Sequence, residues 1–311
     1  MAKKCVKCDK KAVISLAYGP HEFCKEHFLE FFEKRVRRTV RENKLVKGRE
    51  KIAVAYSGGK DSAVTLFLIN KIFGKSNPVE ALLIDEGISK YRDKALKIAE
   101  DNCKKWGVGF KRAFFEKEFG FTMIEVMRQT GPKKLIGSTC AYCGVLRRQV
   151  MNKHAKEMGA GKLATGHNLD DESQSILMNV MDADITRFFR LGPMTQKTKG
   201  VVPRIKPLYL CPENEVIAFA RIAGVKYYEK QGCPFKWQAK RNDFRSMVED
   251  FESKYPGMMF STVRFLKQVK ELAGKKVSGK KVFLCEKCGE LCSAKVCKAC
   301  KMAEKIKGKV N

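Results

Sequence analysis

Residues 52–62 read Ile-Ala-Val-Ala-Tyr-Ser-Gly-Gly-Lys-Asp-Ser, and this stretch decides the fold. The apolar run Ile52–Tyr56 predicts a short buried strand. Ser57, Gly58 and Gly59 follow as a turn that glycine tolerates better than other residues. A strand and a turn that lead into a helix gather free backbone N–H groups at the positive end of the helix dipole. That arrangement suits a phosphate group.

The residues after the turn add a charge and a helix. Lys60 supplies a positive charge, and the apolar run 63–69 predicts a helix. Asp61 or Ser62 is placed to cap that helix. The spacing is not that of the Walker P-loop, which has four residues between its first glycine and the Gly-Lys pair. It resembles instead the PP-loop of the N-type ATP pyrophosphatases, which cleave ATP to AMP and pyrophosphate and adenylate a substrate oxygen.

The composition bounds the class of protein. The chain has 311 residues with 44% hydrophobic content, which is enough for one sizeable core and smaller modules. It has no run of about 18 apolar residues that would span a membrane, and no secretory signal opens it, so we expect a cytoplasmic protein. Lysine and arginine total 63 against 34 acidic residues, a net charge of +29. Such an excess indicates a polyanionic partner, and we expect nucleic acid.

Two of the three sets of cysteines have the spacing of zinc sites. Thirteen cysteines are many for a cytoplasmic protein, in which disulfides do not persist. Near the N-terminus, Cys5-x2-Cys8 and Cys24-x2-His27 predict a tetrahedral zinc site. His21 is an alternative ligand that breaks this spacing. Near the C-terminus, two Cys-x2-Cys pairs predict a zinc ribbon held by Cys285, Cys288, Cys297 and Cys300.

The third set is Cys140, Cys143 and the distant Cys233. The pair Cys140-x2-Cys143 alone suits a redox dithiol or half of a metal site. Three cysteines would leave one iron of a [4Fe–4S] cluster without a protein ligand and free to bind substrate. In an alternative without a cluster, Cys140 and Cys233 pass sulfur as a persulfide.

Strands and helices alternate through the middle of the chain. This order predicts an α/β fold with a doubly wound, Rossmann-like parallel sheet and a ligand at the carboxyl ends of its strands. Further strands are expected at 79–84, 108–115 and 162–165, and helices at 89–106, 144–158 and 172–189. The turns after Tyr56, Ile84 and Thr165 would then face one crevice.

Two pairs of charged residues are candidates for that crevice. Asp170 and Asp171 follow the strand at 162–165, where one carboxylate would hold Mg²⁺ on the ATP phosphates while the other caps the next helix. Arg147 and Arg148 lie about one helical turn after Cys143. One of them would neutralise charge on the phosphate during adenylation, or the arginines contact RNA at the surface.

The motifs together resemble the tRNA 2-thiouridine synthetases of the archaeal and eukaryotic type, relatives of the tRNA cytidine-32 thiolases. The order is the PP-loop, Cys140-x2-Cys143-Gly144, Gly166-His-Asn-Leu-Asp-Asp171 and Lys206-Pro-Leu208, with a zinc module at each end. We therefore expect a PP-loop ATP pyrophosphatase fold flanked by two zinc-binding modules. The expected parts are an N-terminal module (1–46), a catalytic domain (47–256), a helix with a basic linker (257–281) and a zinc ribbon (282–311).

The resemblance implies a tRNA-uridine 2-sulfurtransferase. The uridine C2 oxygen would attack the α-phosphate of ATP, and sulfide would then displace AMP at C2. The resemblance gives catalytic roles to Lys60, Arg147 and Asp171. It implies that Cys140, Cys143 and Cys233 bind the cluster. ATP would contact the following residues: Ala55, Ser57, Gly58, Gly59, Lys60, Asp61, Ser62, Ile84, Arg147, Gly166 and Asp171. The cofactors implied are ATP, Mg²⁺, a [4Fe–4S] cluster and two Zn²⁺.

The substrate and the sulfur donor have alternatives. Residues 144–148 resemble the branch that modifies wobble uridine 34, whereas the loop around Gly166 and the segment 190–193 lean towards the uridine 54 branch. We predict uridine 34, with uridine 54 as the alternative. The sulfur would come from free sulfide or from a ubiquitin-like carrier with a C-terminal thiocarboxylate. We also expect a homodimer. A zinc-ribbon RNA-binding protein without catalysis is the rival outside the enzymes.

Overall fold

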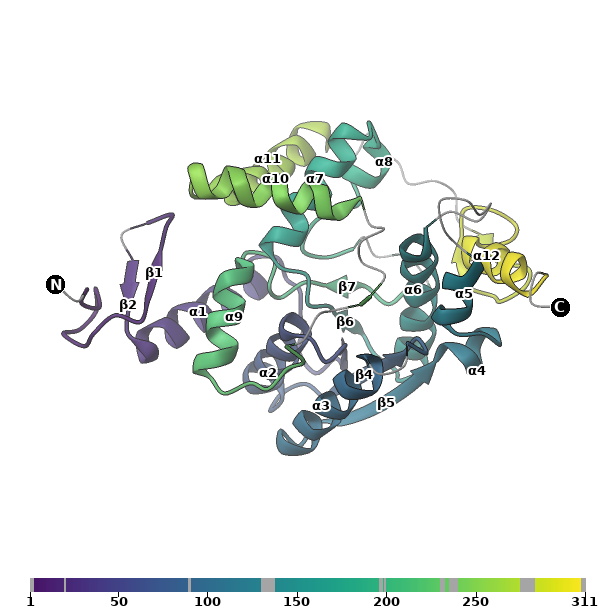
Figure 1. Ribbon diagram of the computed structural model, residues 1–311, viewed down its shortest axis with the longest axis horizontal. Helices are drawn as coiled ribbons and strands as arrows, with labels where there is room; N and C mark the ends of the chain where they lie inside the picture. The colour runs from purple at the N-terminus through teal and green to yellow at the C-terminus, as the bar shows by residue number, and fades with distance from the viewer. Residues whose placement is uncertain are drawn as a thin grey trace.

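A five-stranded parallel sheet lies at the centre of the molecule (Figure 1). The computed structural model describes residues 3–19, 21–88, 91–129, 138–195, 198, 200–229, 233–234, 240–274 and 283–308. The sheet order is β5-β4-β3-β6-β7, and the doubly wound α/β fold is confirmed. The strands are β3 (Ile52–Ala55), β4 (Val79–Asp85), β5 (Gly109–Phe114), β6 (Lys162–Ala164) and β7 (Arg204–Ile205).

The strand order reverses at β3, and this reversal positions the site. From β3 the chain moves outward to β4 and β5, and it then returns to the other side of β3 to form β6 and β7. In an open parallel sheet, a ligand binds where two such neighbouring strands send their connections in opposite directions. The carboxyl ends of β3 and β6 therefore define the crevice.

Helices cover both faces of the sheet. Ile52 and Val54 of β3 pack into one apolar cluster, and Ala53 between them packs into the other. Because side chains alternate across a strand, this pattern buries both faces. One face is covered by α1 (Lys25–Glu42), α2 (Lys60–Phe73), α3 (Tyr91–Lys105) and α9 (Glu213–Ile222). The other is covered by α4 (Phe115–Phe119), α5 (Met123–Gln129) and α6 (Thr139–Glu157).

A further layer of helices shares a third apolar cluster (Figure 1). It consists of α7 (Leu169–Met181), α8 (Ile185–Phe188), α10 (Arg241–Lys254) and α11 (Met258–Ala273). The prediction of one helix over 172–189 is wrong, because Ala183 takes a left-handed backbone angle (φ 51°) that interrupts it. The side chain of Asp184 then accepts a hydrogen bond from the Arg187 N–H and begins α8.

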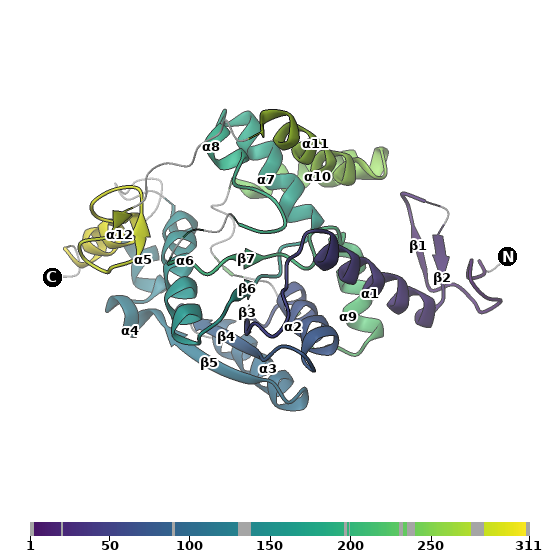
Figure 2. The ribbon, with the colours of Figure 1, turned by 180° about the vertical axis from the view of Figure 1, so that it is seen from behind.

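The two terminal modules lie at opposite ends of the molecule (Figures 1 and 2). The N-terminal module contains β1 (Ile14–Leu16) and β2 (His21–Phe23), and the C-terminal module contains β8 (Phe283–Leu284), β9 (Leu291–Cys292) and α12 (Lys298–Lys307). Helix α12 packs on α6. The domain boundaries stay predictions, and the basic linker over 275–281 lies outside the described residues.

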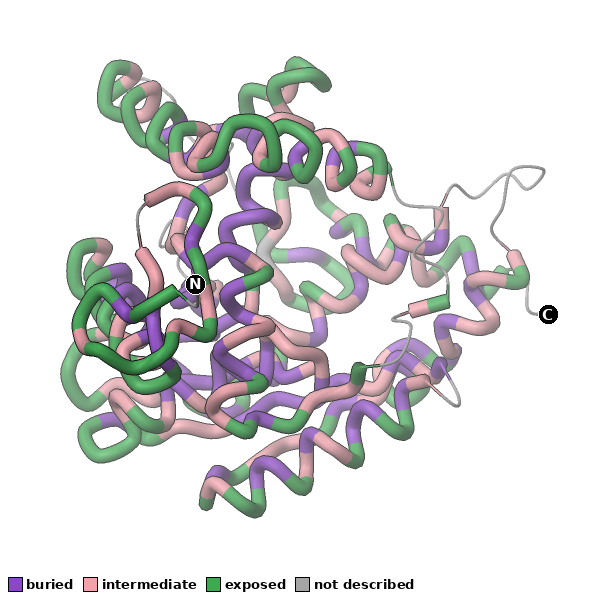
Figure 3. The backbone as a smooth tube through the Cα atoms, turned by 60° about the vertical axis from the view of Figure 1, so that its left-hand side comes forward, coloured by how far each residue is buried: buried purple, intermediate pink, exposed green. Residues whose placement is uncertain are grey.

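Burial follows this architecture. In Figure 3 the buried stretches gather in the sheet and the helices beside it, whereas most residues of α10, α11 and the N-terminal module are exposed or only partly buried. Within the described residues, no helix combines the length and the apolar character that crossing a membrane requires.

Candidate nucleotide and cysteine site

The loop after β3 requires glycine at position 58. Gly58 has a φ of +82°, in the left-handed region that side chains disfavour. A Cβ atom there would lie 2.2 Å from the backbone carbonyl oxygen of Ala95 in α3. The loop therefore packs so closely against α3 that any residue other than glycine at position 58 would clash.

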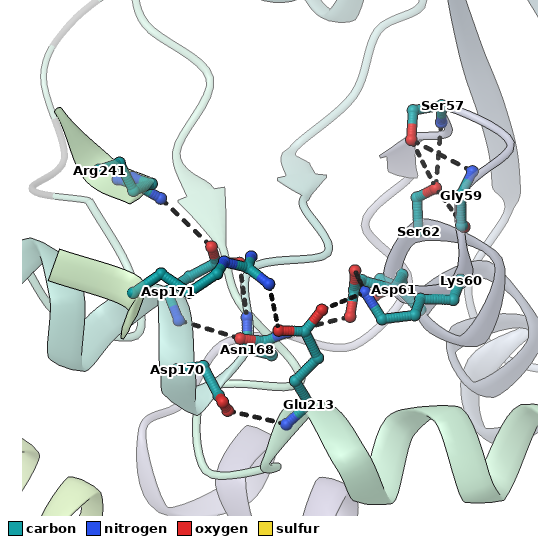
Figure 4. A network of polar contacts seen from close by, with 12 residues as sticks. Ser57, Gly59, Lys60, Asp61, Ser62, Asn168, Asp170, Asp171, Glu213 and Arg241 are labelled. Atoms are coloured by element: carbon teal, nitrogen blue, oxygen red, sulfur yellow. Dashed lines mark hydrogen bonds and ion pairs between the residues drawn. The ribbon is translucent and has the colours of Figure 1, made fainter. Parts of the chain in front are cut away.

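Two serine hydroxyls hold the loop closed (Figure 4). Ser62 Oγ accepts from the Ser57 N–H at 3.1 Å, lies 2.9 Å from Ser57 Oγ, and donates to the Gly59 carbonyl at 3.0 Å. Helix α2 begins at Lys60, and no described side chain caps it. The prediction that Asp61 or Ser62 caps α2 is wrong, because both lie past the N-cap residue Gly59. The first-turn N–H groups of α2 remain suited to an anion.

The loop after β6 touches the loop after β3. A Cβ atom on Gly166 would lie 2.7 Å from the Ser62 backbone nitrogen and 2.8 Å from the Asp61 carbonyl carbon. Asn168, two residues on, donates from Nδ2 to Asp61 Oδ1 at 3.0 Å. These contacts join the carboxyl ends of β3 and β6, where the reversal of strand order places the crevice.

Asp170 and Asp171 have different surroundings. Asp170 is buried, and its Oδ2 accepts from the Glu213 N–H at 2.8 Å. Burial raises its pKa to about 6. Asp171 forms a capping box with Asn168 at the start of α7, and its Oδ1 lies 3.2 Å from Arg241 Nη1 of α10. The Asp170 carboxylate thus accepts a hydrogen bond from the first residue of α9, and Asp171 is the member of the pair that links α7 to α10.

Lys60 lies between two carboxylates. Its ammonium is 3.0 Å from Asp61 Oδ2 and 2.5 Å from Glu213 Oε1 (Figure 4). Burial alone would lower the pKa of Lys60, but these carboxylates raise it above its ordinary value. The side chain therefore stays charged at the entrance to the loop, where Arg245 also reaches Glu213 at 2.9 Å.

Arg147 points inward, and a buried carboxylate holds it there. Its Nη2 lies 2.7 Å from Glu86 Oε1 and 3.3 Å from the Cys143 sulfur. Glu86 follows β4, is 1% exposed, and also binds Arg92 Nε at 2.7 Å. Arg92 in turn donates from Nη1 to the Ser57 carbonyl at 2.7 Å. One chain of polar contacts therefore runs from the PP-loop to Cys143.

The remaining predicted nucleotide contacts lie at strand ends. Ala55 is the last residue of β3 and is half-buried. Ile84 of β4 is buried, and its carbonyl accepts from Arg92 Nε at 2.8 Å. Arg148 is exposed, whereas its neighbour Arg147 is partly buried.

The third set of cysteines gathers beside this chain of contacts. Cys140 and Cys143 lie in the first turns of α6, and Cys233 follows α9 in sequence. Burial raises the pKa values of Cys140 and Cys143, and the proximity of Cys233 raises both further. Cys143 and Cys233 also pack against the same apolar cluster as Ala55. The effect of Cys233 on both thiols places the three cysteines near one another, although their sulfur atoms do not form a group as compact as those of the terminal modules. Three soft ligands so arranged suit a [4Fe–4S] cluster that leaves one iron without a protein ligand.

Each terminal module brings four ligand atoms within 4.8 Å of one another. The N-terminal group contains His27, whereas His21 stacks on Phe23 at a ring distance of 5.8 Å. The members are Cys5, Cys8, Cys24 and His27 at one end, and Cys285, Cys288, Cys297 and Cys300 at the other. Both groups have a donor set suited to a metal ion.

The C-terminal module is anchored to the helix that carries Cys140 and Cys143. Gln149 Nε2 of α6 donates to the Cys288 sulfur at 3.1 Å. Asn152 and Lys156 of the same helix both contact the Glu290 carboxylate. The ligand set of this module and the third cysteine set therefore share one rigid support.

Sequence reasoning missed four side chains that shape the site. Glu86 lies in the turn expected after Ile84 but was given no role, and Arg92, Glu213 and Arg241 have no motif around them. Their partners lie on other elements, such as Arg241 on Asp171. The one signal in the sequence that could have identified them is a charged residue at a position where the pattern of the helix or strand expects a buried side chain.

The comparisons with known proteins settle the family. A family model described as a PP-loop domain matches residues 28–249. This chain belongs to the PP-loop family. Its match to the tRNA 2-thiolation proteins extends over nearly the whole chain, and the predicted resemblance is confirmed.

Three relatives illustrate the similarity. The tRNA-5-methyluridine(54) 2-sulfurtransferase of Pyrococcus horikoshii is 34% identical over 96% of this chain and 93% of its own. The tRNA 2-thiolation protein NcsA of Haloferax volcanii is 33% identical over 97% of this chain and 99% of its own. The structure of the U34-tRNA thiolase NcsA from Methanococcus maripaludis with its [4Fe–4S] cluster superposes with a TM-score of 0.82, at 31% identity, over 97% of this chain and 96% of that one.

Proposed function

We propose that the protein is an ATP-dependent tRNA-uridine 2-sulfurtransferase that acts on uridine 34. The observation that carries the proposal is the chain of contacts from the PP-loop to Cys143. Arg147 Nη2 lies 3.3 Å from the Cys143 sulfur, and Glu86 and Arg92 link it to Ser57. A site for activating an oxygen and a site for delivering sulfur therefore adjoin, as a two-step substitution at one carbon requires.

The adenylation step uses the PP-loop side of the crevice. The loop and the first turn of α2 would hold the ATP phosphates, with Lys60 as a point charge. Asp171 would hold Mg²⁺ on those phosphates, and Arg147 would neutralise charge as the uridine C2 oxygen attacks the α-phosphate. Pyrophosphate leaves, and the C2 oxygen becomes part of a good leaving group, AMP.

The substitution step uses the cysteine side. Cys140, Cys143 and Cys233 would hold a [4Fe–4S] cluster, which supplies an open iron that binds sulfide. Sulfide forms a bond to C2 and AMP departs with the former C2 oxygen, so the step needs no oxidant or reductant. The sulfide would be free or come from a thiocarboxylate carrier. The buried carboxylate of Glu86 would keep Arg147 aimed at the departing phosphate.

The terminal groups of ligands would hold structural zinc. Three thiolates with one imidazole, or four thiolates, are the donor sets of closed tetrahedral zinc sites. Because all four ligands come from the protein, such a zinc ion has no open position for a substrate, and its role would be to stabilise the fold. We further propose that the protein works in the cytoplasm as a homodimer.

The base that is modified can be identified directly. Anaerobically prepared protein is incubated with ATP, Mg²⁺, sulfide and an unmodified tRNA transcript, and the nucleosides of each ribonuclease fragment are weighed. We expect 2-thiouridine at position 34 and one AMP per thiolated base. The U34-tRNA thiolase NcsA supports this choice. Thiolation confined to position 54 would contradict it, and absence of both AMP and thiolated tRNA would favour a non-catalytic RNA-binding protein.

Replacing Cys143 with alanine separates the cluster from the persulfide alternative. A cluster bound by three thiolates should be lost, so iron and sulfide content and thiolation should all fall by at least about tenfold. A persulfide passed between Cys140 and Cys233 would not need Cys143, and activity would persist without iron. Iron analysis and thiolation assays on the same preparation provide the measurement. Cys292→Ala, which changes a cysteine outside both metal groups, should leave both values unchanged.

A further inference from the structure

An open groove of about 520 Å³ lies between α1 and α11, away from the crevice. Four cations line it: Lys34, Arg35 and Arg38 from α1, and Arg264 from α11. The N-terminal module closes one side through Tyr18. Figures 1 and 2 show that α1 and α11 both reach toward the N-terminal module. The groove thus combines the first forty residues of the chain with α11, which is far from them in sequence.

The floor of the groove is fixed. Arg35 is 7% exposed, and its Nη1 binds Glu215 Oε2 at 2.8 Å. Its guanidinium carbon lies 4.6 Å from the centre of the Phe31 ring, a distance typical of a cation over an aromatic face. Tyr18 donates to the other Glu215 oxygen at 2.6 Å, and its ring meets Phe260 edge to face at 4.9 Å. The floor therefore presents flat rings that are already held in place.

The side chains at the rim of the groove, in contrast, are exposed cations that make only surface ion pairs or none among the described residues. Lys34 and Arg38 have side chains 65% and 58% exposed, and among the described residues each pairs only with a glutamate one turn away, at 2.5 Å and 3.9 Å. Such surface pairs contribute little stability. Arg264 is exposed, and no ion pair joins it to any described residue. Three cations on the rim are therefore available to an anion at small cost.

We propose that this groove binds the sugar–phosphate backbone of tRNA, at a distance from the uridine that reacts. The proposal rests on the function proposed above. Exposed cations around a groove suit a nucleic acid, since cations contact the phosphates of its backbone. The net charge of +29 favours the same class of partner. An acidic protein is the competing occupant and is an outcome of the test.

The groove and the crevice share one layer of helices. Arg241 at the start of α10 binds Asp171 beside the PP-loop. Helix α10 has 14 residues, which span about 21 Å, and its far end leads into α11 and the groove. An RNA contact there would hold the body of the tRNA while the target base enters the crevice. It would contribute to binding and leave the chemical step unchanged.

The test compares two double charge reversals in the full-length protein. Arg38→Glu with Arg264→Glu alters the groove, and Lys104→Glu with Lys105→Glu alters the exposed end of α3 by the same net charge. The probe is an unmodified tRNA transcript, and its Kd is measured over a range of salt concentrations. We expect the groove variant to bind at least about tenfold more weakly. The slope of its salt dependence should fall by about one for each phosphate that the variant no longer binds, while the control changes by less than about threefold.

Kinetics complete the test. For the groove variant we expect the KM for tRNA to rise and the rate of AMP release at saturating tRNA to stay the same. A tRNA Kd equal to that of the control would overturn the proposal, as would an unchanged Kd with lost binding of an acidic carrier protein. Failure of the proposed function gives a different result, namely tRNA binding by the wild-type protein without any 2-thiouridine.

Discussion

Replacing Gly58 with alanine is expected to lower ATP-dependent AMP formation by about 100-fold, the loss that follows a displacement of about 1 Å in a reacting group. The new Cβ would lie 2.2 Å from the Ala95 carbonyl oxygen, and φ is +82°. The positive φ alone costs about 1–3 kcal/mol in a residue with a side chain. The carbonyl belongs to the interior of α3, so the loop must move instead. The measurement is AMP release with tRNA and sulfide, together with ATP affinity by calorimetry.

Gly48 provides the matched control. It precedes β3 by a few residues, a Cβ atom added to it would meet no heavy atom within 4 Å, and its φ is not in the left-handed region. Gly48→Ala should therefore keep AMP formation within about twofold, consistent with ordinary surface substitutions. A Gly58→Ala protein that is folded and binds ATP as tightly as the wild type would show that the loop does not form the phosphate site.

The structural features that the sequence predicts well are those determined by residues close together in the chain. The apolar run Ile52–Tyr56 and the glycine turn predict β3 and the start of α2 because each signal lies within a few residues. The cysteine spacings are equally local, and His27 rather than His21 joins the N-terminal group as the spacing indicates. The fold class follows from the alternation of these elements.

The parts predicted poorly depend on contacts between distant segments. Glu213 reaches Lys60 from α9, and Arg241 reaches Asp171 from α10. Nothing in the local sequence of either residue specifies its partner. The break after α7 was missed for another reason, since Ala183 adopts a left-handed backbone that alanine rarely takes. Tertiary packing overrides the helical pattern at that point.

Glu86 is the residue whose importance the structure raises most, because its single carboxylate serves two arginines. Replacing it with glutamine is expected to lower the free energy of unfolding by about 3 kcal/mol, since Arg92 would remain buried without an anionic partner. Glu86 is 2% and Arg92 4% exposed at the side chain, so water cannot replace the lost charge. Arg147, which is 42% exposed, should contribute less to this loss. Urea unfolding gives the measurement.

Glu80 in β4, the strand that leads to Glu86, is the matched control. It pairs with Lys51 at 2.6 Å, but both side chains are about one-quarter to one-third exposed (26% and 32%). Glu80→Gln should therefore cost less than about 1 kcal/mol. If Glu86→Gln cost no more than Glu80→Gln, the buried carboxylate would not be what holds the two arginines.

The same variant separates support of the fold from support of the chemistry. The rate is measured without urea, at a temperature where the Glu86→Gln protein is folded. In this variant Arg147 would no longer be held against the Cys143 sulfur. A guanidinium in the wrong position stabilises the developing charge on the phosphate poorly. Single-turnover AMP formation should then fall by about 100-fold, the effect of losing one oriented electrostatic group. Glu86→Asp keeps the charge on a shorter side chain and should recover part of the rate. A rate unchanged in the folded Glu86→Gln protein would assign Glu86 to stability alone.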